Sequence, residues 1–299
     1  MTGIGLWLRA AALAVLMPVF VMPPITLDRQ VYNVIVVLDI TGSMNALDQH
    51  LDGVSVSRIA MEKRSVRLLL RTLPCGSRLG LAIFVEAQPF LLFEPVEVCE
   101  NYAPLEGEIF AIDWRMGWDS ESHIAEAVRA SIKLAAGLQA DLVVMTDGQE
   151  TPPLAWSDPI HFADLHDTVH GALIGVGGHD FVPIPKFDVY GKEIGVYQPG
   201  DVPSEHGGMF RGREHLSAVD EPHLRALSAE TGLAYDHLED EGTLASLLPR
   251  VAARRTLPSS VSLRWIPAGL ALSLLAAAFW PRRYATRVLL RWRARVPQP

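Results

Sequence analysis

The stretch "VIVVLDITGS", residues 34–43, runs from an apolar, β-branched segment directly into an aspartate. A continuous apolar run of this kind predicts a strand that is buried on both faces of a parallel sheet. Asp39 ends the run, and Thr41 and Ser43 follow it at alternate positions. Gly42 is expected to let this loop curl, so that the alternate side chains point at one centre. Taken alone, Asp39 is better explained as a helix N-cap, and only the other loops favour a different role.

Strand-like and helix-like segments alternate along the rest of the chain. We expect strands at residues 31–38, 79–84, 90–98, 142–145, 171–176 and 233–235. We expect helices at residues 57–73, 122–137, 221–232 and 241–251, and basic residues stand between the apolar residues of the first one. This alternation predicts an α/β fold with a doubly wound, mostly parallel sheet. Ligands of such sheets bind at the carboxyl ends of the strands, where Asp39 is placed.

Two further loops carry oxygen-bearing side chains near expected element ends. "DSESHIAEAV", residues 119–128, places Ser122 just before a helix, and "VVMTDGQE", residues 143–150, places Asp147 directly after a buried strand. Carboxylates and hydroxyls that meet at one sheet edge suit a hard cation, Mg²⁺, Ca²⁺ or Mn²⁺, better than zinc. We therefore predict a divalent-cation site formed by five residues: Asp39, Thr41, Ser43, Ser122 and Asp147.

The motifs "VVLDITGSM", "SHIAEAV" and "VVMTDGQE", in this order on an α/β pattern, resemble the von Willebrand factor A domain and its metal-ion-dependent adhesion site. Thr41 stands where that family has a serine, and Ser122 stands where it has a threonine. The resemblance covers residues 31–248 and implies a non-enzymatic binding module. In that family few carboxylates of the domain bind the cation directly, so its positive charge is only partly neutralised. A carboxylate of a partner protein then fills the one open coordination position.

The two ends of the chain differ in composition from its middle. Residues 1–27 contain only Arg9 as a charge and predict an N-terminal transmembrane segment or signal anchor, with a cleaved signal peptide as the alternative. Residues 263–281 predict a transmembrane helix, and the arginine-rich residues 282–299 a basic cytoplasmic tail. Residues 28–258 are then expected to form one periplasmic domain of a bacterial inner-membrane protein.

The expected periplasmic part is strongly acidic. Removing the eight arginines of the two ends from 26 basic residues leaves 18 against 34 acidic ones. The middle of the chain therefore lacks the basic footprint that nucleic acids require, and it suits cations or basic protein surfaces.

Cys75 and Cys99 flank two expected strands that turn near residues 87–88. In an antiparallel hairpin the two cysteines would lie opposite each other, so an oxidising compartment would allow a disulfide. Two free buried thiols are the alternative.

The family resemblance narrows to a bacterial, membrane-anchored subgroup through the ending "LSAVDEPHLRALSAETGLAYDHLED" and the two flanking apolar segments. One reading is an Mxa-type accessory protein, implicated in assembly or calcium insertion of a periplasmic methanol dehydrogenase, together with other membrane accessory proteins. The other is a Bat-type membrane scaffold that works with a cytoplasmic MoxR-like ATPase in stress tolerance or complex assembly. Trp114 and Trp118, just before the second loop, are expected at the rim of the partner interface, with core packing as the alternative.

Three other chemistries receive less support. A hydrolase with Ser43 as nucleophile would need glycines where Thr41 and Asn45 stand, and "GVGG" at residues 175–178 lacks a complete nucleotide-binding pattern. "HFADLHDTVH", residues 161–170, would place two histidines on one face of a helix and could hold a second metal ion. Polar surface histidines are the favoured interpretation of that segment.

Overall fold

A computed structural model of the chain describes residues 3–117, 121–151, 160–188, 190–199, 201 and 215–279. Two compact units emerge, one of residues 30–257 and one of residues 1–29 with 258–299. The helices are α1 Gly3–Leu16, α2 Arg58–Thr72, α3 Tyr102–Ala111, α4 Ile124–Gly137, α5 Glu221–Thr231, α6 Thr243–Val251 and α7 Trp265–Phe279. Short 3-10 helices are η1 Met17–Phe20, η2 Gly42–Asn45 and η3 Trp114–Met116.

The larger unit is built on a six-stranded sheet in the order β13-β8-β7-β2-β5-β6. Its strands are β2 Asn33–Asp39, β5 Arg78–Val85, β6 Gln88–Glu97, β7 Asp141–Thr146, β8 Gly171–Gly175 and β13 Ala234–His237. All neighbours run parallel except β5 and β6, which form an antiparallel hairpin at one edge. The predicted α/β fold with a mostly parallel sheet is confirmed.

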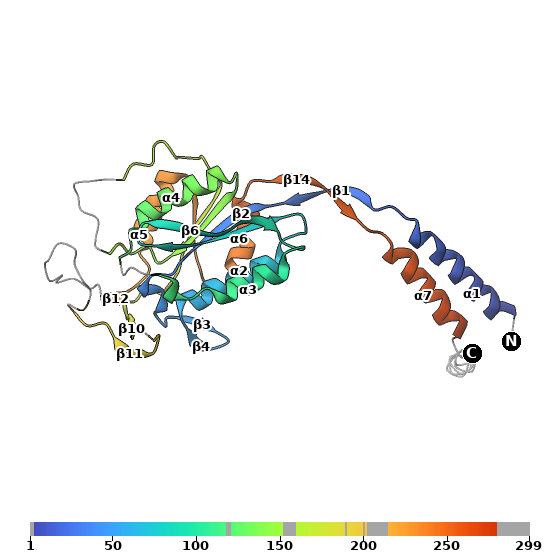
Figure 1. Cartoon of the computed structure of the whole chain (residues 1–299), viewed down its shortest axis with the longest axis horizontal. Coiled ribbons are helices and arrows are strands. Elements are labelled where there is room, and N and C mark those ends of the chain that lie inside the picture. The colour runs from blue at the N-terminus through green and yellow to red at the C-terminus, as the bar shows by residue number, and fades with distance from the viewer. Residues whose placement is uncertain are drawn as a thin grey trace, which may run out of the picture. The chain divides into compact units, whose positions relative to one another are not determined.

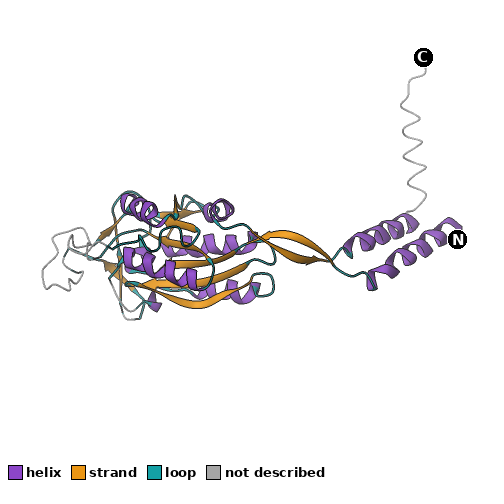
Figure 2. Cartoon of the chain, turned by 90° about the horizontal axis from the view of Figure 1, so that it is seen from above, coloured by secondary structure: helices purple, strands orange, loops and turns teal. Residues whose placement is uncertain are grey.

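Helices cover both faces of this sheet, with α4 and α5 on one side and α2 and α3 on the other (Figure 1; Figure 2). The central strand β2 explains why: its side chains alternate between two separate cores. Val36 and Leu38 pack with α2, α3 and α6, whereas Ile35 and Val37 pack with α4 and α5. Each fully buried side chain of this size stabilises the fold by roughly 1.5–3 kcal/mol, so the apolar run at residues 34–38 fixes β2 at the centre.

Smaller elements surround the sheet. Short antiparallel pairs join β3 Gln49–Leu51 to β4 Val54–Val56, β10 Pro185–Phe187 to β11 Glu193–Val196, and β9 Val182–Pro183 to β12 Leu216–Ser217. These pairs and α3 have no clear signal in the sequence, and the α3 segment "YAPLEGEIFA" is only weakly amphipathic. Cys75 and Cys99, on either side of the β5–β6 hairpin, form a disulfide with a Cα–Cα distance of 5.3 Å.

The smaller unit contains α1, η1 and α7, with α1 and α7 packed against each other, and most of the strand pair β1 Ile25–Val31 and β14 Arg255–Val261. Arg9 lies over the ring of Phe279 at 4.5 Å. Among the described residues, no helix combines the length and the apolar character that a membrane crossing requires. α1 and α7 lie within residues 1–27 and 263–281, the two segments for which the sequence predicts membrane spans. The basic tail, residues 282–299, lies outside the described residues.

Candidate metal centre

Asp39 is the last residue of β2, and its carboxylate is fully buried. Oδ1 accepts hydrogen bonds from the Thr41 backbone N–H at 2.9 Å and from the Thr41 hydroxyl at 2.7 Å. Oδ2 accepts a hydrogen bond from the Thr146 hydroxyl at 2.6 Å. The carboxylate is therefore oriented by groups at the ends of two neighbouring strands, β2 and β7, and it is not acting as the N-cap of a helix.

The first loop continues from Asp39 into η2, which begins at Gly42. The hydroxyl oxygens of Thr41 and Ser43 lie 3.4 Å apart, so the predicted alternation does bring these two donors together. Gly42 itself is not required for this arrangement. Its φ lies outside the left-handed region, and an added Cβ would meet no described atom within 4 Å. The expectation that Gly42 enables the curl of the loop is therefore wrong.

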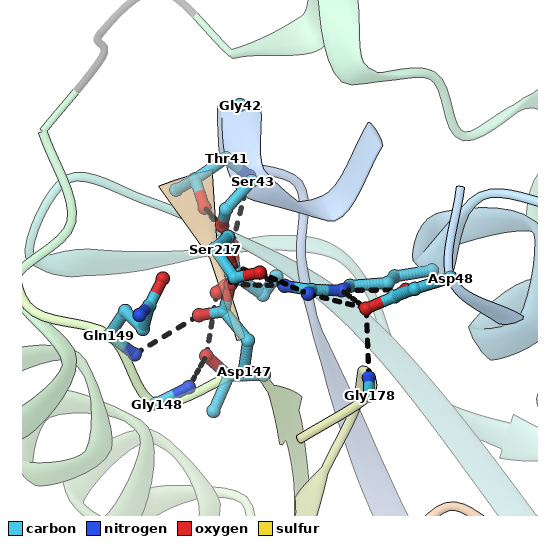
Figure 3. Close-up of polar contacts among 12 residues, drawn as sticks. Thr41, Gly42, Ser43, Asp48, Asp147, Gly148, Gln149, Gly178 and Ser217 are labelled. Atoms are coloured by element: carbon cyan, nitrogen blue, oxygen red, sulfur yellow. Dashed lines mark hydrogen bonds and ion pairs between the residues drawn. The ribbon is translucent and has the colours of Figure 1, made fainter. Parts of the chain in front are cut away.

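Asp147 follows β7 directly and is also fully buried. Its Oδ1 accepts a hydrogen bond from the Gln149 backbone N–H at 3.0 Å. Its Oδ2 accepts one from the Ser217 hydroxyl at 2.9 Å and one from the Arg58 guanidinium at 2.8 Å. Figure 3 shows Asp147 and Ser217 together, with the Thr41–Ser43 loop beside them. The two predicted aspartates therefore meet at one edge of the sheet.

Arg58, in the first turn of α2, connects two of the acidic residues at this edge of the sheet. Its side chain is completely buried, and it binds Asp48 through Nε and Nη2 as well as Asp147 through Nη1. Burial opposes ionisation of Asp48, but the hydrogen bonds and charge of Arg58 outweigh it and lower the pKa of Asp48 below its usual value. Asp48 also accepts a hydrogen bond from the Gly178 N–H at 2.8 Å.

The electrostatics of the cluster are dominated by buried negative charge. Burial, followed by the nearby charge of Asp147, raises the pKa of Asp39 to about 7. Glu62 lies one helical turn after Arg58, and both of its carboxylate oxygens are buried without a hydrogen-bond partner in the described part of the chain. Burial and then the charge of Asp39 raise the pKa of Glu62 well above its usual value. One arginine thus does not compensate the acidic groups that gather here.

Ser122 lies at the same sheet edge, bridged to Glu86 beyond the end of β5 and to Thr151 in the loop after β7. Its hydroxyl oxygen is buried and has no hydrogen-bond partner among the described residues. The carboxylate of Glu150 lies at the N-terminus of the following helix, α4, where it accepts hydrogen bonds from the backbone N–H groups of Ile124 and Ala125. The second loop is therefore anchored to the third by backbone bridges and by this carboxylate.

These residues fit a hard divalent cation. Carboxylate and hydroxyl oxygens are the ligands that Mg²⁺, Ca²⁺ and Mn²⁺ take, and the Ser122 hydroxyl has no hydrogen-bond partner within the described part of the chain. Direct hydrogen bonds join Asp39 and Thr41, and Thr41 lies beside Ser43. No hydrogen bond between described residues ties the side chain of Ser122 to the other four, so its part in the site stays a prediction.

The sequence also suggested functional roles for two tryptophans and two histidines. Trp114 begins η3 and stacks on Phe187 with a centroid distance of 4.6 Å, and it also packs against the core, so its place at a partner rim stays a prediction. Trp118 lies outside the described residues. His166 and His170 lie in an exposed turn and not on a helix, which agrees with the surface interpretation.

Sequence reasoning missed five polar residues of the cluster: Asp48, Arg58, Glu62, Thr146 and Ser217. For two of them a signal existed. Arg58 and Glu62 occupy positions i and i+4, and Val66 and Leu69 continue the same helix face into the core. Charged residues at core positions of an amphipathic helix indicate a buried polar cluster, because an unpaired charge is costly there.

Part of the chain matches a known protein family. Residues 34–149 match the family described as von Willebrand factor type A domain. The matched segment contains the three motifs that resemble this family, and its α/β fold agrees with the match. A comparison with curated proteins finds no match.

Solved structures share the fold. An aerotolerance-related membrane protein from Bacteroides fragilis, with multiple mutations to serine, is 18% identical, with a TM-score of 0.51 over 73% of this chain and 97% of that one. The conserved hypothetical protein BatB from Bacteroides thetaiotaomicron is also 18% identical, with a TM-score of 0.51 over 73% of this chain and 96% of that one. At this level of identity the similarity concerns the fold alone.

Proposed function

We propose that this chain is a non-enzymatic protein-binding module whose ligand site depends on a divalent cation held by Asp39, Thr41, Ser43, Ser122 and Asp147. The observation that carries the proposal is the meeting of two fully buried aspartates with neutral hydroxyls at the carboxyl edge of the sheet. A bound cation supplies an electrophilic centre for a carboxylate of a partner protein.

The chain's own residues prepare this site in two ways. Thr41 and Thr146 fix the two oxygens of Asp39, so the carboxylate does not need to reorient when a ligand arrives. Arg58 and Ser217 hold Asp147 on the opposite side and neutralise part of its charge. The other proposed ligands of the cation are neutral hydroxyls, so a carboxylate from outside could complete its coordination.

We place the domain in an oxidising compartment at a bacterial membrane, with the periplasm as the expected location. The Cys75–Cys99 disulfide supports an oxidising compartment, because such bonds are rare in the cytosol. The apolar helices α1 and α7, with exposed Leu6, Trp7 and Leu13, support association with a membrane. The B. fragilis relative is described as a membrane protein.

Between the two roles considered for the subgroup, the Bat-type scaffold has the better support. Both reported relatives belong to that description, one as an aerotolerance-related protein and one as BatB. In this role a cytoplasmic MoxR-like ATPase would contact residues 282–299. The Mxa-type role, with a periplasmic dehydrogenase as partner and calcium as cargo, rests on the sequence resemblance.

Cation binding provides the first test. Chelator-treated wild-type protein should bind Mn²⁺, Mg²⁺ or Ca²⁺ in calorimetric titrations, and Asp39→Asn and Ser43→Ala should lose that binding. Ser55→Ala, in the exposed β3–β4 hairpin, is the matched control and should bind as wild type does. Unchanged affinity in Asp39→Asn would reject the site.

Partner capture provides the second test. Wild-type protein should retain its partners in the presence of Mg²⁺ and release them when EDTA is added, while Asp39→Asn should capture none. A variant without residues 282–299 distinguishes the two roles. Loss of an ATPase from the captured set would support the Bat-type role, whereas an intact set that contains a dehydrogenase would support the Mxa-type role.

A further inference from the structure

A second group of metal-ligating side chains lies at the carboxyl ends of the last two strands of the sheet. His237 ends β13, His179 lies in the loop after β8, and Glu221 is the first residue of α5. One ligand atom from each residue lies within 4.8 Å of the other two. The parallel pairing of β8 and β13, which sets Gly175 beside His237, brings the three segments to one point.

The contacts within this group leave ligand atoms available. The rings of His179 and His237 stack at a centroid distance of 5.1 Å, with 22° between their planes. Nδ1 of His237 lies 3.9 Å from Oε1 of Glu221, which is too far for a hydrogen bond. Within the described part of the chain this nitrogen is buried and has no hydrogen-bond partner. A buried imidazole nitrogen with no partner is costly unless a ligand satisfies it.

The carboxylate of Glu221 is already oriented by its neighbours. Its Oε1 accepts a hydrogen bond from the Tyr235 hydroxyl at 3.0 Å, and Arg225 approaches its Oε2 at 3.5 Å. A carboxylate offers about four acceptor positions, so Oε1 can keep the tyrosine and still bind a cation. Hydrogen bonds of this kind to a ligating carboxylate are typical supports of metal sites.

The backbone that carries His179 is also held in place. The N–H of Gly178 donates to Asp48 Oδ2 at 2.8 Å, and the carbonyl oxygen of Gly178 accepts from the Val219 N–H at 2.9 Å. Gly177 precedes it with φ of +124° and packs directly against Arg58. Hydrogen bonds already hold both the N–H and the carbonyl of Gly178, the residue before His179. Binding of a ligand at His179 would therefore lose little backbone conformational entropy.

We propose that His179, Glu221 and His237 form a second metal site, which binds a transition-metal ion of the Zn²⁺ class. Two imidazoles and one carboxylate are a zinc-type donor set, chemically distinct from the all-oxygen set around Asp39. Ligand atoms of a tetrahedral zinc ion lie about 3.3 Å apart. His237 Nδ1 and Glu221 Oε1 are now 3.9 Å apart, and the three ligand atoms lie within 4.8 Å of one another, so side-chain rotations would have to bring them closer when the ion binds. A water molecule would complete the coordination.

Zinc titration of the full-length, tag-free protein tests this proposal. After chelator treatment and in excess Mg²⁺, the wild-type protein should bind Zn²⁺ in calorimetry, and Co²⁺ should give the visible absorption bands of a tetrahedral site. His179→Gln should abolish both signals, and Glu221→Gln should weaken binding at least about tenfold. Asp39→Asn should keep them, which separates this site from the first one.

The controls address surface histidines and folding. His166→Gln with His170→Gln removes two exposed imidazoles from another part of the surface and should leave Zn²⁺ binding unchanged. The side chain of His179 is exposed, so His179→Gln should show wild-type far-UV circular dichroism and thermal unfolding in EDTA. Zn²⁺ binding that survives in His179→Gln, or that disappears in the His166 and His170 variant, would overturn the proposal.

Discussion

Arg58 donates a hydrogen bond from Nη1 to Oδ2 of Asp147 over 2.8 Å, and neither side chain is exposed to solvent. The pair joins the first turn of α2 to the loop after β7. Removing two charges from water costs several kcal/mol per ion, so such a pair exists only where further hydrogen bonds satisfy both groups. Asp48 and Ser217 provide them here. The pair therefore fixes the position of Asp147 at the candidate metal centre.

Replacing Arg58 should strongly destabilise the domain. Arg58→Met leaves Asp147 and Asp48 without their cation, and loss of one partner of a buried pair costs about 3–5 kcal/mol. The matched control is Arg64→Met on the same helix, whose ion pair with Glu241 is partly exposed and should change stability by less than about 1 kcal/mol. Urea unfolding monitored by circular dichroism measures both values. Equal effects of the two variants would show that Arg58 has no special role.

Gly177 and Gly42 should respond in opposite ways to an added methyl group. At Gly177 the φ of +124° is unfavourable for alanine, and the new Cβ would lie 2.6 Å from the guanidinium carbon of Arg58. Gly177→Ala should therefore lower stability by several kcal/mol and displace Arg58. Gly42→Ala meets open space and should be nearly neutral. Chemical unfolding of the two variants gives the comparison, and a neutral Gly177→Ala would contradict the close packing.

Glu62 should make the metal-free domain less stable as the pH rises. Its folded pKa is raised by burial and by Asp39, so the folded state keeps a proton that the unfolded state releases above the ordinary pKa of 4.5. Where the unfolded state binds fewer protons, the free energy of unfolding falls with pH, by up to about 1.4 kcal/mol per unit for one group. This stability is fully present below pH 4.5 and is lost as the pH approaches the folded pKa.

Glu62→Gln has nearly the same size and cannot ionise, so it isolates this effect. Its stability relative to wild type should increase as the pH rises above 4.5 and level off once the pH passes the raised folded pKa of Glu62, measured by urea unfolding in EDTA at matched ionic strength. Glu241→Gln, which removes a partly exposed carboxylate, is the control and should show a nearly flat difference. A flat difference for Glu62→Gln would mean that Glu62 is ionised in the folded state.

Reduction of the disulfide should destabilise the sheet edge. Cys75 and Cys99 are separated by 24 positions, and closing a loop of this length is worth about 3 kcal/mol in the chain-entropy account. Wild-type protein should lose about that much on treatment with a phosphine reductant. The double variant Cys75→Ser with Cys99→Ser should have the lower stability from the start and should not respond to the reductant. An equal response of both proteins would exclude the disulfide as its cause.

The sequence predicts the elements that have a strong period or a long apolar run. The strands around Val36 and Val144 and the helices α2, α4 and α5 lie within a few residues of their expected positions. The short pairs such as β3–β4 and the helix α3 were not foreseen, because few buried side chains or distinct turn residues mark them. The two transmembrane segments expected within residues 1–27 and 263–281 stay predictions, because no helix among the described residues has the length and apolar character of a membrane span.

The residues of the candidate sites also fall into two groups, those whose position the sequence predicts and those that only the tertiary structure brings together. Local sequence determined that Asp39 and Asp147 end buried strands and that Thr41 and Ser43 alternate after the first, because strand burial and side-chain period are properties of neighbouring residues. Only the tertiary structure decided that Arg58 turns inward to bind Asp147, and that His179, Glu221 and His237 converge. Those contacts join segments distant in sequence: α2 meets the loop after β7 at the first, and the pairing of β8 with β13 brings the histidines together at the second.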